Sequence, residues 1–204
     1  MRIKLLLLLL LPALLLAGCE QHGEIGDMAV VLGMAIEKAA DGQLLVTAEL
    51  AHRDSINGSD KSVVVSAAAK NWDKIEESLA RACDKRLYWG HLVLLLIDES
   101  CGGDGIADIL QRFYLDQRLS PTIYTAVCQN SGAEIINSGF GESPYASQGI
   151  AQRLSLAKKD NDDICFTVDQ GMRRLYGNED VVMTEIAAEG GKAEFQRAVN
   201  ISGL

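Results

Sequence analysis

The sequence lacks the short motifs that usually mark a catalytic or metal-binding site. None of its five cysteines belongs to a Cys-x-x-Cys pair, so zinc binding and thioredoxin-like chemistry have no support. Its three histidines, His22, His52 and His91, are scattered and form no metal-ligand pattern. The chain has no G-x-G-x-x-G or P-loop motif, and Ser138 and Ser143 lie outside any G-x-S-x-G frame. We therefore expect no enzyme activity, no bound metal and no cofactor.

The sequence is also poor in positive charge. It contains 19 Lys and Arg against 28 Asp and Glu, which gives a net charge of −9. An acidic surface repels the phosphate backbone of nucleic acids and the headgroups of anionic lipids. Nucleic acid is thus not an expected partner, and neither is a membrane bound through a broad basic face.

Long apolar runs are almost absent, and the single exception is at the amino terminus. Residues 5–17 are apolar, but this run of 13 residues is too short for a membrane-spanning helix, which needs about 20 residues. Arg2 and Lys4 precede the run and Leu16-Ala17-Gly18-Cys19 ends it, in the order of an export signal with a lipobox. This order predicts that Cys19 becomes the diacylated first residue of a protein anchored outside the cytoplasmic membrane. An uncleaved transmembrane anchor is the alternative.

Four further cysteines leave two interpretations open. Export permits disulfides, and four thiols allow three pairings. We favour the other interpretation, in which they are buried single thiols. The four are Cys83, Cys101, Cys128 and Cys165.

The pattern of apolar residues predicts alternating strands and helices. Asp41-Gly42 separates the first two strands and indicates a hairpin, and residues 52–61 read as an exposed loop. Asp104 and Ser143 are expected to cap helices, with Pro144 in the first helical position, and Gly177 is expected to end the last helix. Strands are predicted at 28–36, 44–50, 62–66, 88–98, 122–128 and 181–187, and helices at 70–83, 104–113, 133–138, 144–158 and 164–176.

These elements indicate an α+β (mixed α/β) fold, with small mixed β-sheets packed against amphipathic helices. Residues 1–18 form the predicted lipoprotein signal peptide. Residues 19–200 form one α/β region, with a possible internal boundary near 139–165, where 158–163 is a charged linker. The segment 92–97 is apolar throughout, so 88–98 is expected to be a central strand covered on both faces.

Two groups of residues could carry chemistry, and each has a simpler interpretation. His91 lies in the apolar segment 88–98, where a histidine is more often a structural core or turn residue than a catalytic one. Asp160, Asp162 and Asp163 could bind calcium, but their spacing is not that of a helix-loop-helix site, so a solvated charged linker is favoured. We assign His91 to structure and expect its replacement to affect stability.

Two blocks of sequence resemble a known family. Glu24-Ile25-Gly26-Asp27-Met28-Ala29-Val30-Val31-Leu32-Gly33, soon after Cys19, and Leu87-Tyr88-Trp89-Gly90-His91-Leu92 resemble conserved blocks of the C-subunit lipoproteins of bacterial spore germinant receptors. The resemblance covers nearly the whole mature chain but only the amino-terminal half of a usual family member, whose carboxy-terminal domain is missing. The chain departs from the family at Glu20-Gln21-His22-Gly23 and near Arg112–Arg118.

The resemblance implies a non-enzymatic subunit on the outer face of the spore's inner membrane. Such a subunit works with two integral-membrane partners, and small nutrients trigger germination through the complex. A shortened form of this subunit is therefore the leading hypothesis. The alternatives are an envelope lipoprotein that binds small solutes or assists assembly in another system, and an exported hydrolase that would use Ser143 and His91.

Overall fold

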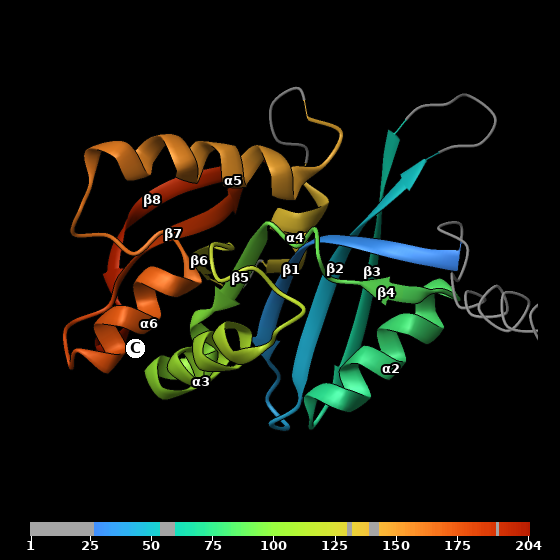
Figure 1. Ribbon diagram of the computed structural model, residues 1–204, viewed down its shortest axis with the longest axis horizontal. Helices are drawn as coiled ribbons and strands as arrows, with labels where there is room; N and C mark the ends of the chain where they lie inside the picture. Colours follow the sequence, from blue (N-terminus) through green and yellow to red (C-terminus); the bar gives the residue numbers. More distant parts are fainter. Residues whose placement is uncertain (1–26, 54–59, 130–131, 139–142, 191) are drawn as a thin grey trace, which may run out of the picture.

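The described residues form one mixed β-sheet between two layers of helices. The computed structural model describes residues 27–53, 60–129, 132–138, 143–190 and 192–204, so the predicted signal peptide and Cys19 lie outside them. The eight strands follow the order β3-β2-β1-β5-β6-β7-β8, with β4 beside β1 (Figure 1). The strands are β1 Met28–Lys38, β2 Leu44–Arg53, β3 Asp60–Ala69, β4 Arg86–Tyr88, β5 Leu94–Asp98, β6 Tyr124–Cys128, β7 Val182–Glu189 and β8 Lys192–Asn200.

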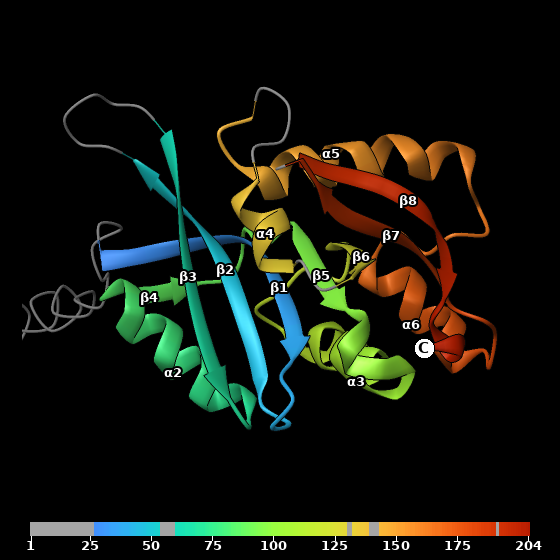
Figure 2. The same ribbon diagram turned by 180° about the vertical axis from the view of Figure 1, so that it is seen from behind.

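The helices cover both faces of this sheet. One face packs against α2 (Trp72–Cys83), α3 (Gly102–Leu115) and α6 (Val168–Tyr176), and the other packs against α4 (Gly132–Asn137) and α5 (Ala146–Ala157). Figures 1 and 2 show these layers from opposite sides. The predicted α+β class is confirmed, but the strands form a single sheet rather than several small ones. Among the described residues, no helix combines the length and apolar character that crossing a bilayer requires.

The centre of the sheet is parallel and fully buried. β5 pairs in parallel with β1 and with β6, and each of its five residues is buried. Coverage on both faces explains why this strand is an unbroken apolar run ending in Asp98. Its central position was predicted. The prediction of one strand over 88–98 was wrong, because a turn separates β4 from β5.

The predicted first hairpin is confirmed. β1 and β2 pair antiparallel across a turn in which Gly42 has φ +77° and the Asp41 carboxylate accepts the Gln43 N–H. A left-handed residue of this kind strongly favours glycine. β2 continues to Arg53 and β3 starts at Asp60, so both ends of the predicted loop 52–61 are strand and the strand predicted at 62–66 is longer than expected. The middle of that predicted loop, 54–59, lies outside the described residues.

Three helix starts differ from their predictions. α3 starts at Gly102, which places Asp104 in its first turn instead of at the cap. α5 starts at Ala146, after Ser143-Pro144, because a side chain from β2 caps it. α6 starts at Val168, since the preceding residues are extended and Thr167 accepts the Gln170 N–H as the cap.

Other helix predictions agree with the structure. α2 begins after Asn71, whose side chain accepts the Lys74 N–H, and α6 ends at Gly177 as predicted. The charged linker 158–163 starts with a short 3-10 turn at Lys158–Asp160.

The last strand was missed by the sequence prediction. β7 was expected to end the sheet, but the chain turns at Gly190, with φ +57°, and returns as β8 antiparallel to β7. β8 contains Lys192, Glu194 and Arg197 and buries few side chains, so its sequence shows little alternation. Each edge of the sheet is therefore formed by a long antiparallel pair of strands, β2–β3 at one edge and β7–β8 at the other (Figure 2).

Candidate functional site

A groove of about 430 Å³ opens at the amino-terminal ends of β5 and β6. Three segments of the chain form its walls: the turn 90–93 before β5, the residues just before β6, and one face of α5. Its floor is apolar, because Leu92, Ile123 and Ala151 are at least nine-tenths buried. Its rim is polar and exposed, and carries His91, Ser120, Thr122, Gln148 and Gln152. Of the described residues that line it, none is Asp, Glu, Lys or Arg.

The turn that forms the first wall belongs to the second resemblance block. The Leu92 N–H donates to the Trp89 carbonyl at 3.0 Å, and the Val93 N–H donates to the Leu32 carbonyl on β1 at 2.8 Å. Trp89 is buried below the turn, whereas Gly90 is exposed. A Cβ at Gly90 would lie 2.6 Å from the hydroxyl oxygen of Tyr88, so a larger residue here would have to displace the exposed Tyr88 ring.

His91 is exposed at the edge of the groove. Its imidazole packs against the ring of Tyr88 at a tilted angle of 59°, with ring centroids 5.6 Å apart. The prediction of a turn residue is confirmed, but a position in the core is wrong. Because the side chain is exposed, the condition for a large loss of stability on replacement, a buried hydrogen bond, is not met.

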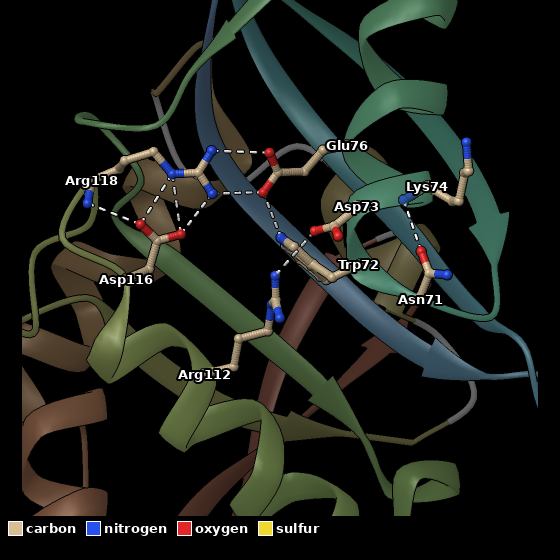
Figure 3. A network of polar contacts seen from close by, with 8 residues as sticks. All are labelled: Asn71, Trp72, Asp73, Lys74, Glu76, Arg112, Asp116 and Arg118. Atoms are coloured by element: carbon tan, nitrogen blue, oxygen red, sulfur yellow. Dashed lines mark hydrogen bonds and ion pairs between the residues drawn. The ribbon is translucent and has the colours of Figure 1, made fainter.

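A polar network fixes the segment that leads to the second wall (Figure 3). The Arg118 guanidinium donates to both carboxylate oxygens of Glu76 on α2, at 2.6 and 2.9 Å, and to Asp116 at 2.7 Å. Trp72 Nε1 donates to Glu76 at 2.6 Å, and Arg118 also lies 5.9 Å from the ring centroid of Trp89. Arg118 thus ties the chain after α3 to α2 and to the base of the 90–93 turn.

The hydrogen bonds of the network shift the pKa values of its members. The hydrogen bond from Arg118 holds the pKa of Asp116 below its usual value, and the bonds to Glu76 and then Asp116 raise the pKa of Arg118. A carboxyl group with a depressed folded-state pKa stabilises the fold fully above its unfolded pKa and loses that contribution as the pH falls through the folded-state value. The network is therefore expected to weaken in acid.

Replacing Arg118 with alanine is expected to lower the free energy of unfolding by about 1 kcal/mol, discounted because half the side chain is exposed. Urea denaturation at neutral pH measures this loss, which should shrink in acid. Arg118→Lys should recover only part of it, because lysine cannot form the two-pronged contact. Arg81→Ala is the control, since Arg81 makes an exposed pair on α2; equal losses from both variants would contradict the role of the network.

The third wall, α5, is positioned by a buried carboxylate on β2. Glu49 is 0 % exposed and accepts the N–H groups of Ala146 and Ser147 at 2.9 and 2.8 Å, together with the Ser62 hydroxyl at 2.8 Å. A negative side chain at a helix start satisfies free N–H groups and complements the helix dipole. α5 also packs closely on β1, because a Cβ built on Gly33 would overlap the Ser147 side chain. The wall thus has a fixed place on the sheet.

The other residues considered from the sequence lie apart from the groove. Cys19 and His22 lie outside the described residues, and His52 is an exposed residue near the end of β2. Ser138 donates its hydroxyl to the Ile135 carbonyl, and Ser143 accepts the Tyr145 N–H. Neither serine lines the groove with His91, which removes the geometric support for the hydrolase hypothesis. Within the described ranges, no three His, Cys, Asp or Glu residues are grouped to hold a metal ion; Asp162 and Asp163 are exposed.

The four described cysteines are free thiols. Cys101, Cys128 and Cys165 are buried as predicted, while Cys83 is only partly buried. Burial raises the pKa of all three buried thiols, that of Cys101 to about 11. Thiols of this kind are poor nucleophiles at neutral pH.

The sequence signalled only part of this site. The 87–92 block identified the first wall, but the polar residues of the other two walls were missed. Gln148 and Gln152 are four residues apart, a spacing that places both on one face of a helix and could have indicated a shared surface.

Comparison with known protein families places the chain in context. The chain matches the family described as "Spore germination protein N-terminal domain" over residues 21–188. No curated protein and no solved structure shows a significant match. The match covers most of the chain and includes all three walls of the groove. The chain therefore belongs to the spore germination protein family, through its N-terminal domain, and has a germination-related role.

Proposed function

We propose that this chain is a lipid-anchored, non-enzymatic subunit of a nutrient germinant receptor complex. The observation that carries the proposal is the position of the family domain, which begins at residue 21, two residues after Cys19. A diacylglycerol on Cys19 would hold the domain at the extracytoplasmic face of the spore inner membrane, beside integral-membrane receptor subunits.

The described chemistry supports binding rather than catalysis. The groove combines a buried apolar floor with a polar rim in which the described residues include no Asp, Glu, Lys or Arg, as small-molecule and peptide sites do. The three buried thiols have raised pKa values, so they are unsuited to nucleophilic attack at neutral pH.

Replacing Cys19 with alanine is expected to abolish lipid labelling and to release the protein from the membrane. Two acyl chains provide stable anchoring that the acidic protein surface cannot replace. Fractionation of spore membranes after a carbonate wash, with metabolic labelling by a fatty-acid analogue, measures both effects. Cys83→Ala is the matched control, because Cys83 is a partly buried thiol within the folded domain. Full membrane retention of an unlabelled Cys19→Ala protein would contradict the anchor.

Complex membership needs a separate experiment. The labelled wild-type protein, solubilised in mild detergent, should co-purify with multi-spanning membrane proteins of germinating spores. Co-purification with the permease of a solute-uptake system instead would identify a lipoprotein of another system.

A further inference from the structure

We propose that the groove beside the 90–93 turn binds a small, uncharged, hydroxylated ring, such as a monosaccharide or a nucleoside. The inference rests on the proposed function only for the use of this binding in germination. The binding itself is argued from the size, polarity and rigidity of the groove.

The size of the groove fits a small solute. Its volume of about 430 Å³ lies within the range of about 300–1,000 Å³ typical of ligand pockets. Leu92, Ile123 and Ala151 give it a buried apolar floor, against which the C–H face of a ring can pack. Tyr124 adds an aromatic side chain to the same surface.

The rim offers the groups that hydroxyls bind. The amides of Gln148 and Gln152 each provide both donors and an acceptor, and they lie one helical turn apart on α5. On the opposite wall, the hydroxyls of Ser120 and Thr122 lie 2.7 Å apart and hydrogen-bond to each other. One of these protons is used in that bond, which leaves one donor and free acceptor lone pairs for a ligand.

The charge of the site selects against ions. No Asp, Glu, Lys or Arg is among the described lining residues, and the ring of His91 is exposed at the rim, where water screens any ionic contact. A charged solute would therefore lose water without gaining a strong ionic partner. The net charge of −9 adds long-range repulsion of anions. A neutral solute avoids both costs.

The walls are held in place before any ligand arrives. Glu49 fixes the start of α5, and Arg118 fixes the chain that leads to Ser120. A preorganised site loses less conformational entropy on binding. The geometry therefore favours recognition of a defined ring over a flexible chain.

The test uses the full chain, purified in detergent and labelled with ¹⁵N, titrated with D-glucose, D-ribose and inosine. We expect at least one of them to give saturable amide shifts confined to residues 90–93, 120–124 and 148–155. Glucuronate and glucose 6-phosphate should bind the site at least tenfold more weakly. Gln148→Ala/Gln152→Ala should weaken binding about tenfold or more, the effect of losing about 1.4 kcal/mol of hydrogen bonding.

Leu156→Ala is the matched control, because Leu156 is a 58 % exposed residue of α5 that does not line the groove. It should bind as the wild type does. The inference is overturned if none of the three neutral probes shifts these residues, if the anionic analogues bind equally well, or if the double glutamine variant and the control behave alike. Loss of binding in a protein that is still anchored and assembled overturns this inference alone, whereas binding by a protein that is neither anchored nor assembled overturns the proposed function alone.

Discussion

Replacing Glu49 with alanine should lower the free energy of unfolding by about 3 kcal/mol, because it leaves buried hydrogen-bond donors without an acceptor. The wild-type carboxylate accepts two backbone N–H groups at the start of α5 and the Ser62 hydroxyl, and it is fully buried. Alanine provides none of these acceptors and leaves a cavity as well. Urea denaturation followed by circular dichroism measures the loss.

Two variants make this prediction specific. Glu49→Gln keeps the shape and one carbonyl oxygen, but its amide NH₂ would face a backbone N–H, so it should recover only part of the stability. Glu189→Ala is the control, because Glu189 is exposed at the end of β7 and its carboxylate accepts a hydrogen bond from the exposed Gln196 side chain. If Glu49→Ala and Glu189→Ala were equally stable, the carboxylate would not be the anchor of α5.

Replacing Gly33 with alanine should destabilise the fold by a similar amount, about 3 kcal/mol, through overpacking between β1 and α5. The added Cβ would lie 1.8 Å from Ser147 Oγ and 2.4 Å from Ser147 Cβ. Both atoms are near the backbone of a helix start that Glu49 already fixes, so the clash cannot be relieved by moving the tip of a flexible side chain. Thermal and urea unfolding of the purified variant measure the cost.

A second substitution tests the cause of that loss. In the Gly33→Ala background, Ser147→Gly removes both clashing atoms and should restore part of the stability, although Ser147→Gly alone should be destabilising. Gly203→Ala is the control, since a Cβ there meets nothing within 4 Å. Strictly additive effects of the two substitutions would show that the contact between β1 and α5 is not the source.

The sequence predicted best those elements whose pattern is local. The stripe of Trp72, Ile75 and Leu79 on α2 follows helical spacing, and all three side chains are buried. The apolar run of β5 indicated a covered central strand because every residue in it packs against one layer or the other. Periodicity alone is sufficient in such cases.

Elements that depend on distant partners were predicted poorly. The start of α5 depends on Glu49, about 97 residues earlier in the chain, so Ser143-Pro144 was a plausible cap that the fold does not use. Residues 164–167 were predicted to be helical. In the structure, the backbone of Cys165 forms an isolated β-bridge with Met183 of β7, and Thr167 becomes the cap of α6. β8 was missed because it is an exposed strand at the end of the sheet and needs few apolar residues.

The groove was predictable in part for the same reason. The block containing Gly90-His91 could be recognised as a unit because it is continuous in the sequence. Its role as a wall could not be predicted, because the other two walls come from residues about 30 and 60 positions later. The residues before β6 meet it through the parallel pairing of β5 with β6, and α5 meets it through its packing on β1 and its cap from Glu49. Topology of this kind is not encoded in any single segment.

The place of β1 in the sheet has a consequence for how the protein folds. β1 is the first of the described strands, yet it lies in the interior of the sheet and hydrogen-bonds to β2, β4 and β5. One of its sides stays without its final neighbour until the chain as far as Asp98 is available, so the middle of the molecule must close through long loops. Such long-range contacts slow folding, and until they form they leave the apolar edge of β1 unpaired and able to associate with other chains. A chain cut short before β5 would be expected to aggregate instead of folding into a smaller domain.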